Sequence, residues 1–271
     1  MIAPTTTAEH QRQVCATFAG ADPRMAEVLQ AAVRHVSALV EEVGLTREEW
    51  RAGIEFLTAV GQKCDRERQE FILLSDTLGI SMLVEMVNDQ PAAGATEPTV
   101  LGPFYVPGAQ GRDFGDSVVD DPSTGGESLV LHGTVRDLDG RPVADATIDV
   151  WEVQPNGSYD IQEDSQKRNL RGVFTPLDDG RYEVRTVRPV DYTIPEDGPV
   201  GAMLRAAGRG AWRPAHIHVM VRAPGFRPLV THVFDQGSPW LGNDAVFGVR
   251  DSLIAPMDDG SCTFDLVVER I

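Results

Sequence analysis

The 271-residue sequence has few cysteines, a deficit of basic residues and no long apolar run. Its three cysteines, Cys15, Cys64 and Cys262, are far apart and form no CxxC pair, which excludes a disulfide framework and a zinc–thiolate site. Lys and Arg number 24 against 41 Asp and Glu, so the net charge is −17, and nucleic acid and anionic membranes are poor partners. No run approaches the roughly 18 apolar residues of a membrane span, and residues 1–11 show neither the basic nor the apolar region of a secretory signal. The sequence therefore predicts a cytoplasmic globular protein that binds neither nucleic acid nor membrane.

The first third of the chain has its apolar residues at helical spacing. Asp22, directly before a proline, is a suitable N-cap for a first long helix. Thr46 and Glu49 have the spacing of a capping box at the start of a second helix. A third helical stretch is predicted over about 65–87, with Gly79 as a point where it weakens or bends. These residues predict a helical N-terminal domain.

The rest of the chain has the pattern of a β-protein. Residues 90–127 are rich in Pro, Gly, Ala and Asp, as in a long loop or linker, and hairpin-type turns are expected at 139–140 and 179–180. Because no helical pattern separates the short β-branched runs, an antiparallel arrangement is favoured. The expected strands are 129–135, 147–153, 181–187, 216–222, 229–234 and 263–270. The predicted fold class is α+β, with a helical domain over 1–98 and a mostly antiparallel β-sandwich over 99–271.

A pair of histidines lies on one of the predicted strands. Side chains alternate across a strand, so His216 and His218 should leave one face and Ile217 and Val219 the other. Two imidazoles on one face can bind a single ion, although two partly exposed strand histidines are an equally good interpretation of this pattern. A zinc hydrolase would add an acid such as Asp191.

Two of the four tyrosines follow predicted strands, in loops rich in Gly and Pro. They are Tyr159 and Tyr192. Loops at sheet ends are where side chains converge on a site, and phenolate is a hard anionic ligand suited to Fe(III). Taken singly, each tyrosine is better explained as a ring packed at a sheet end with its hydroxyl in water.

Together these residues resemble the iron site of the intradiol ring-cleavage dioxygenases. The order and spacing of Tyr159, Tyr192 and the segment 213–218 match that family, and residues 99–105 match its TxxGPFY stretch. The likeness covers about residues 20–270. Within the family the chain is most similar to the hydroxyquinol 1,2-dioxygenases, through the segments 73–79, 231–234 and 244–250.

The resemblance implies a non-haem Fe(III) centre and an enzyme that uses O2. The four implied metal ligands are Tyr159, Tyr192, His216 and His218. Tyr192 would leave the metal and act as a base for the substrate, and Arg213 would stabilise negative charge developing on the ring. His232, where many catechol-cleaving relatives carry Gln, would hydrogen-bond close to the reacting oxygen atoms. The alternative, and the commoner role for such a residue, is a strand histidine whose hydrogen bonds are satisfied within the sheet.

The resemblance also implies a substrate pocket, a product and an assembly. Its expected substrate-binding residues are Leu73, Asp76, Val100, Leu101, Gly102, Pro103 and Val246. A buried Asp76 would suit a third ring hydroxyl, which favours hydroxyquinol (benzene-1,2,4-triol) and its cleavage to 3-hydroxy-cis,cis-muconate, the enol form of maleylacetate. Catechol or a substituted catechol is the alternative substrate, and a non-catalytic β-sandwich binding module is the alternative from another class. A homodimer through the N-terminal helices, with a lipid between the subunits, is carried over from the family.

Overall fold

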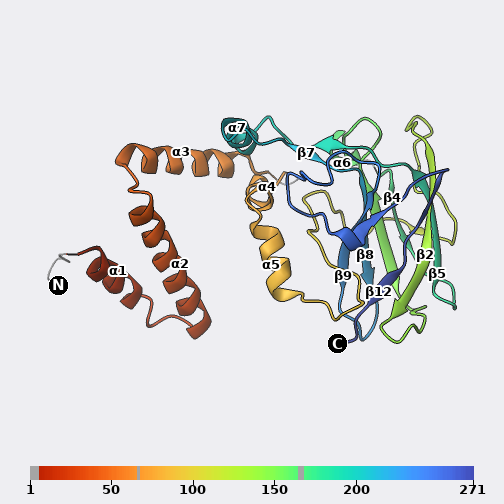
Figure 1. Cartoon of the computed structure of the whole chain (residues 1–271), viewed down its shortest axis with the longest axis horizontal. Coiled ribbons are helices and arrows are strands. Elements are labelled where there is room, and N and C mark those ends of the chain that lie inside the picture. The colour runs from red at the N-terminus through yellow and green to blue at the C-terminus, as the bar shows by residue number, and fades with distance from the viewer. Residues whose placement is uncertain (1–5, 66–67, 164–167) are drawn as a thin grey trace. The chain divides into compact units, whose positions relative to one another are not determined.

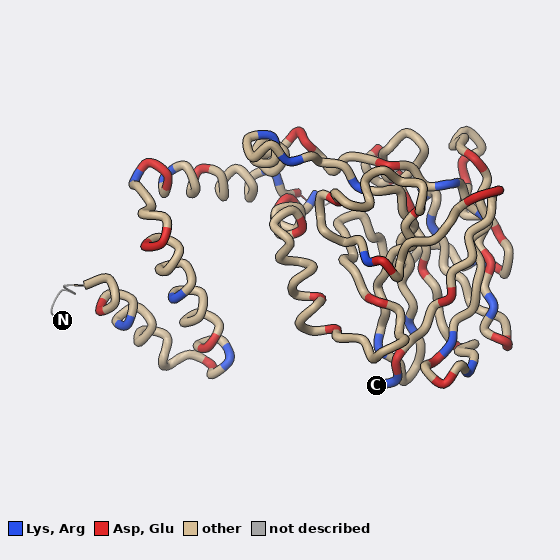
Figure 2. The backbone as a smooth tube through the Cα atoms, in the orientation of Figure 1, with Lys and Arg blue, Asp and Glu red and all other residues tan. Residues whose placement is uncertain are grey.

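The computed structural model describes residues 6–65, 68–163 and 168–271, and the chain forms two compact units. One unit is Met1–Thr58 and the other is Ala59–Ile271. Figure 1 shows the helices of the first unit and the sheets of the second. Asp and Glu residues are spread over both units among the Lys and Arg residues (Figure 2).

The first unit is helical. It contains α1 (Thr7–Ala16), α2 (Pro23–Glu42) and most of α3 (Arg47–Lys63). The Asp22 carboxylate accepts hydrogen bonds from two backbone N–H groups at the start of α2, and the capping box of α3 pairs Thr46 with Glu49 in both directions. Both predicted caps are therefore confirmed. Helix α1 was not predicted. The signal that could have identified it is Thr6, a suitable N-cap residue, whose hydroxyl accepts a hydrogen bond from the Glu9 N–H.

The helical stretch predicted over about 65–87 is two helices, α4 (Glu70–Thr77) and α5 (Ile80–Asn88). The break falls at Gly79, the residue where weakening or bending was expected. Gly79 separates them with φ of 73°, in the left-handed region where a helix cannot continue and glycine is favoured. The break turns the chain, so that α4 and α5 form two elements of the second unit.

The second unit contains two main sheets and a short one. The strands are β1 (Gly111–Arg112), β2 (Ser128–Asp137), β3 (Thr147–Glu152), β4 (Arg171–Phe174), β5 (Arg181–Val187), β6 (Tyr192–Thr193), β7 (Trp212–Arg213), β8 (His216–Arg222), β9 (Leu229–Asp235), β10 (Ile254–Ala255), β11 (Ser261–Thr263) and β12 (Leu266–Val268). One sheet has the order β1-β4-β3-β8-β9-β10, the second joins β11, β12 and β5 to β2, and β6 pairs with β7. The remaining helical elements are α6 (Asp160–Glu163), α7 (Pro199–Ala206) and η1 (Asp251–Leu253).

The long strand pairs are antiparallel, as predicted, and the short edge strands make the sheets mixed. Strands β3, β8 and β9 pair antiparallel in the first sheet, and β2 pairs antiparallel with β5 in the second. The strand expected over 263–270 is two strands, β11 and β12, both parallel to β2. The turns predicted at 139–140 and 179–180 are both tight, with the Asp137 N–H donating to the Arg141 carbonyl and the Leu177 N–H donating to the Arg181 carbonyl. The first closes a short antiparallel ladder that includes the Arg136–Pro142 bridge, and beyond each turn the chain passes from one main sheet to the other.

The hydrophobic core lies between the two main sheets. It includes Ile148 and Val150 from β3, Ile217 and Val219 from β8, and Leu131 from β2. On the other side of the first sheet, a smaller buried cluster contains Trp151, Tyr159 and Tyr192. This cluster forms one wall of the site described below. Among the described residues, no helix combines the length and the apolar character needed to cross a membrane.

Candidate metal centre

The two predicted strand histidines lie side by side on β8. His216 and His218 are both buried, with their Nε2 atoms 3.2 Å apart, while Ile217 and Val219 enter the core on the opposite face. The prediction that the two imidazoles share one face is confirmed. The Nδ1–H of His216 donates to the Pro214 carbonyl at 2.7 Å, so its Nε2 carries a lone pair, which lies 3.2 Å from the Arg213 Nη1. Trp151 stacks on the His218 ring at a centroid distance of 4.6 Å.

Two tyrosines bring their hydroxyl oxygens to the same place. Tyr159 lies in the loop after β3, and Tyr192 begins β6, where it pairs directly with Arg213 of β7. The two Oη atoms are 3.2 Å apart, and the Tyr159 Oη is 2.9 Å from the Nε2 of His218. The structure thus brings together the four side chains that the sequence singled out as metal ligands.

The spacing and chemistry of these four atoms fit a metal ion. Metal–nitrogen bonds of about 2.0–2.1 Å at right angles place neighbouring ligand atoms about 3 Å apart. The three distances that link the two phenols and the two imidazoles are 2.9, 3.2 and 3.2 Å. The Nε2 atoms of the two histidines lie at hydrogen-bonding distance, so either a proton on one of them or a cation beside both is needed to avoid repulsion between their lone pairs. The donor set combines hard oxygens with imidazole nitrogens, as a first-row metal such as iron prefers.

Burial controls the protonation of the site. Desolvation, followed by nearby positive charge, lowers the pKa of His216 and of His218 well below the ordinary value, so both imidazoles are neutral. Burial, followed by the neighbouring Tyr192, raises the pKa of Tyr159 well above its ordinary value. A strongly charged ion would have to displace the phenolic proton of Tyr159 on binding.

Arg213 is held beside these atoms by a buried carboxylate. Burial disfavours its charge, but Asp244 and then Tyr192 raise the pKa of Arg213 above its ordinary value. Its Nε is 3.1 Å from one Asp244 oxygen, and its Nη1 is 3.2 Å from the Nε2 of His216 and 3.4 Å from the Tyr192 Oη. The role of Asp244 was missed, because 31 residues separate the ion pair in sequence.

A second buried ion pair fixes the Tyr159 loop. Asp160, the next residue, accepts hydrogen bonds from the Nε and the Nη2 of Arg171, whose Nη1 also donates to the Phe104 carbonyl. The Phe104 ring in turn stacks on Tyr159 at 4.4 Å. Sequence reasoning did not identify Asp160, Arg171 or Phe104, whose contacts depend on the packed fold.

A cavity opens next to the Tyr192 and Arg213 side chains. It is lined by Leu73, Asp76, Val100, Gly102, Pro103, Phe104, Tyr192, Ile194, Pro195, Arg213 and Val246. Six of the seven residues predicted to bind substrate line this cavity, and the exception is Leu101, which is partly exposed. Sequence reasoning missed Phe104, Ile194 and Pro195. A wider outer cavity shares five of these lining residues, which gives the inner cavity a route to solvent.

Asp76 is the buried acid of this cavity. Its side chain belongs to α4, and only 3% of the residue is exposed. Desolvation raises the pKa of Asp76, and the Ser81 hydroxyl and the Arg213 charge partly oppose that rise. A carboxyl group in this environment is a strong acceptor for a polar group that enters the cavity.

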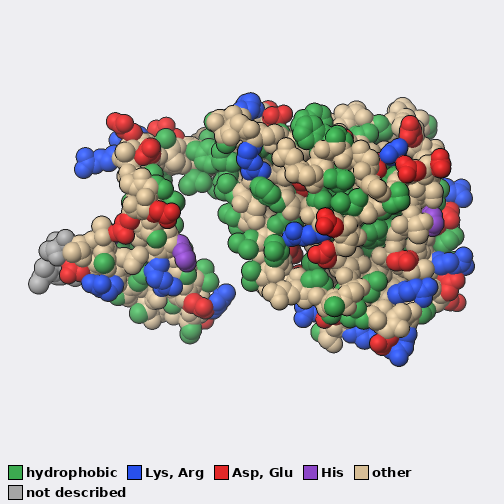
Figure 3. Space-filling view, viewed as in Figure 1, with side chains coloured by type: hydrophobic (Ala, Val, Ile, Leu, Met, Phe, Trp, Pro, Cys, Tyr) green, Lys and Arg blue, Asp and Glu red, His purple; other side chains and the backbone are tan. Residues whose placement is uncertain are grey.

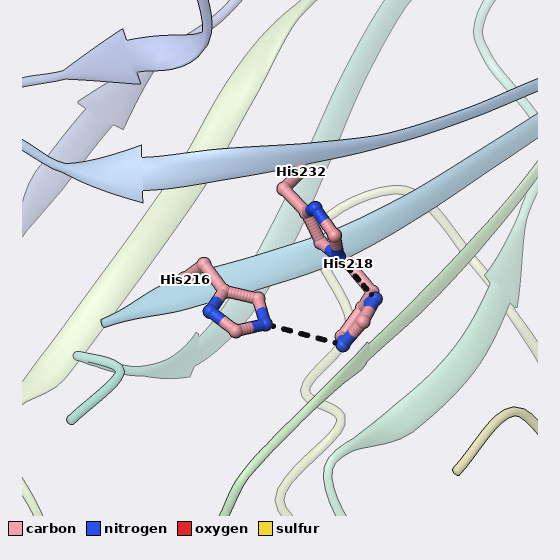
Figure 4. Close-up of side chains that lie close together, drawn as sticks. All are labelled: His216, His218 and His232. Atoms are coloured by element: carbon pink, nitrogen blue, oxygen red, sulfur yellow. Dashed lines mark hydrogen bonds between the residues drawn. The ribbon is translucent and has the colours of Figure 1, made fainter. Parts of the chain in front are cut away.

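His232 and Asp191 lie elsewhere than their predicted roles require. His232 is packed behind His218, with its Nε2 2.8 Å from the Nδ1 of His218 (Figure 4). The Nδ1 of His232 is 2.8 Å from the Thr99 Oγ1. Both ring nitrogens are therefore occupied away from the cavity. One Asp191 oxygen accepts from the Ala215 N–H and the Ser238 hydroxyl, so Asp191 fixes the start of β8.

Comparisons with known proteins agree with this geometry. Residues 100–267 match a family described as "Dioxygenase", and residues 22–96 match "Catechol dioxygenase N terminus". The chain is 49% identical to a 6-chlorohydroxyquinol 1,2-dioxygenase from Cupriavidus pinatubonensis, over 85% of this chain and 83% of that one. It is 48% identical to a hydroxyquinol 1,2-dioxygenase from Rhizobium sp., over 86% and 79%. The solved structure of hydroxyquinol 1,2-dioxygenase from Pseudomonas putida DLL-E4 superposes with a TM-score of 0.90 at 44% identity, covering 98% of this chain and 99% of that one.

The chain belongs to the intradiol ring-cleavage dioxygenase family, and it is an enzyme of that kind. The resemblance seen in the sequence and the α+β fold are confirmed. Family membership decides against both the non-catalytic binding module and the zinc hydrolase.

Proposed function

We propose that this enzyme uses a non-haem Fe(III) ion to cleave hydroxyquinol between its adjacent hydroxyl groups. Both atoms of O2 would enter the product, 3-hydroxy-cis,cis-muconate. The observation that carries this proposal is the meeting of two phenol oxygens and two imidazole nitrogens at 2.9–3.2 Å beside a buried arginine. The similar proteins named for hydroxyquinol support the choice of substrate.

Tyr159, Tyr192, His216 and His218 would hold the iron. Bound there, the Fe(III) would supply a Lewis acid that makes a coordinated diol reactive towards O2. Tyr192 lines the cavity, and its Oη lies 3.4 Å from the Arg213 Nη1. From this position the Tyr192 oxygen would take a proton from a diol in the cavity. The Arg213 charge, fixed by Asp244, would stabilise negative charge on the ring in the transition state.

Asp76 would select the third hydroxyl of hydroxyquinol. A buried carboxyl group costs free energy unless a donor pairs with it, and the third hydroxyl of the substrate supplies such a donor. Catechol has no hydroxyl at that position and could not add this hydrogen bond to the one that Asp76 makes with Ser81. A site built to hydrogen-bond a substrate hydroxyl discriminates against the analogue that lacks it.

Steady-state kinetics and isotope labelling test this proposal. We expect kcat/KM to be at least about tenfold higher for hydroxyquinol than for catechol, a difference of about 1.4 kcal/mol in the transition state. The Asp76→Ala variant should lose that preference, mainly because its kcat/KM falls for hydroxyquinol and changes little for catechol. Reaction under 18O2 should place two labelled atoms in the product. A tenfold preference for catechol would make the enzyme a catechol dioxygenase, and a product with one labelled atom would refute the proposed reaction.

We also propose a homodimer through the N-terminal helices, with a lipid between the subunits. Apolar side chains on α2 and α3, including Val36, Leu39, Trp50 and Ile54, are 49–60% exposed. Apolar residues also gather on the exposed side of α5 (Figure 3). Sedimentation should give a dimer mass that Val36→Glu reduces to a monomer, and solvent extraction of the dimer should release a lipid. A monomeric wild-type chain would contradict the dimer. The cytoplasmic location stays a prediction from the sequence.

A further inference from the structure

His232 and Thr99 form a buried hydrogen-bonded chain with one of the proposed metal ligands. His232 lies on β9 directly opposite His218 of β8, and its ring nitrogens reach the His218 Nδ1 and the Thr99 Oγ1 at 2.8 Å each. The backbone N–H of Thr99 donates to the Val230 carbonyl, which fixes the threonine against the same strand. Thr99 and His232 are fully buried, so these partners are not exchanged for water.

The direction of this chain decides which nitrogen of His218 carries the proton. If His218 donates its Nδ1–H to the Nε2 of His232, then His232 must donate its own Nδ1–H to the Thr99 oxygen. The Nε2 of His218 then keeps its lone pair, which faces Tyr159 and His216. In the opposite direction Thr99 donates to His232, and the proton of His218 lies on Nε2, where it blocks metal binding.

We propose that Thr99 and His232 form a relay that holds His218 in its Nδ1–H tautomer and so keeps its Nε2 available to the metal. The relay rests on the proposed function, in which His218 is a ligand. His232 is a positioning residue that touches neither substrate nor metal, and Thr99 acts through two imidazole rings. Groups that hydrogen-bond to the far nitrogen of a ligating histidine contribute about 10–100-fold to metal affinity.

Four variants of the full-length chain separate this role from simple packing. His232→Leu removes the relay, and Thr99→Val removes only the acceptor of the His232 Nδ1–H. His232→Gln keeps an oxygen to accept from His218 and an N–H to donate to Thr99. Thr231→Val is the matched control, because Thr231 is also fully buried on β9 but its hydroxyl donates to the Glu97 carbonyl, outside the relay.

Two measurements on metal-stripped protein test the relay. Co²⁺ affinity, measured in competition with a chelating dye, should fall about 10–100-fold in His232→Leu and about tenfold in Thr99→Val. His232→Gln and Thr231→Val should stay within about threefold of wild type. Long-range 1H–15N NMR should find His218 as the Nδ1–H tautomer in wild type, and the Nε2–H form should gain population in Thr99→Val.

Either of two results would overturn the relay. One is wild-type Co²⁺ affinity in Thr99→Val, and the other is an Nε2–H tautomer of His218 in the wild-type chain. The failure of the proposed function would look different: a wild-type chain with the Nδ1–H tautomer that opens no diol ring would refute the activity and leave the relay standing.

Discussion

The two units of the chain differ sharply in what they bury. Among the described residues before Ala59, none is buried, and the apolar side chains of α2 and α3 are largely exposed. The second unit buries its core and also charged groups, including Glu152, Asp160, Arg171, Arg213 and Asp244. The free energy that stabilises the site therefore comes from the second unit. The exposed apolar face of the first unit is consistent with the proposed dimer.

The largest effect should come from breaking a buried ion pair of the second unit. Replacing Arg171 by Met leaves the Asp160 carboxylate buried without its partner, which costs about 3–5 kcal/mol of unfolding free energy. Because Asp160 follows Tyr159, we also expect turnover to fall. Urea denaturation and steady-state kinetics on the same preparation measure both effects.

Arg181→Met is the matched control for that variant. Arg181 pairs with Asp179 at 2.7 Å, but both side chains are more than half exposed. An exposed pair contributes about 0–1 kcal/mol. Equal losses in the two variants would show that burial of the Asp160–Arg171 pair does not matter.

A smaller effect, of opposite sign, should come from Glu152 in the sheet core. Desolvation, opposed by the Thr186 hydroxyl and the Val187 N–H, raises the pKa of Glu152 from 4.5 to about 8. Between these pH values the unfolded chain binds fewer protons than the folded chain, so the unfolding free energy falls as pH rises from 4.5 to 8. Glu152→Gln removes this loss, and its advantage over wild type should reach on the order of 2–5 kcal/mol at pH 8.

Urea denaturation at pH 5 and pH 8 measures this difference. The advantage should be small at pH 5 and should grow with pH. Glu55→Gln, at an exposed position on α3, should leave the pH dependence unchanged. A Glu152→Gln advantage that is the same at both pH values would show that Glu152 does not titrate between them.

The smallest effect should come from the capping box of the helical unit. Thr46→Ala removes the hydroxyl that accepts from the Glu49 N–H, at an exposed site, and should cost about 1 kcal/mol. Amide hydrogen exchange should speed up in the first turn of α3. Thr58→Ala, which removes a hydroxyl bonded to the Ile54 carbonyl within the helix, should cost less. A Thr46→Ala loss as large as that of Arg171→Met would contradict the contrast between the units.

Features encoded by neighbouring residues could be predicted from the sequence. The caps at Asp22 and Thr46 and the shared face of His216 and His218 follow from spacings of two to four residues, and the structure confirms them. The pairing of Tyr159 with Tyr192 spans 33 residues, and only the family resemblance pointed to it. The family resemblance therefore indicated a contact between distant residues that local periodicity could not predict.

Groups that act through distant partners could not be predicted. Asp244 reaches Arg213 across 31 residues, and Thr99 reaches His232 across 133. His232 was expected beside the reacting atoms, but β9 pairs with β8 in a register that places it behind His218. Gly79 could be predicted as the weak point of the 65–87 stretch, but nothing in the apolar spacing shows that it adopts a positive φ and ends one helix before the next begins.

The visible absorption spectrum of the Fe(III)-loaded full-length chain tests the central claim most directly. Phenolate bound to Fe(III) absorbs visible light by charge transfer, so we predict a red protein whose band weakens or shifts in both Tyr159→Phe and Tyr192→Phe. The other two tyrosines, Tyr105 and Tyr182, are matched controls because their hydroxyl groups make hydrogen bonds elsewhere. The Tyr105 hydroxyl accepts from the Arg222 guanidinium, and the Tyr182 hydroxyl donates to the Phe264 carbonyl. Their Phe variants should keep the wild-type band. A colourless iron-loaded chain, or an unchanged band in Tyr159→Phe and Tyr192→Phe, would contradict the account.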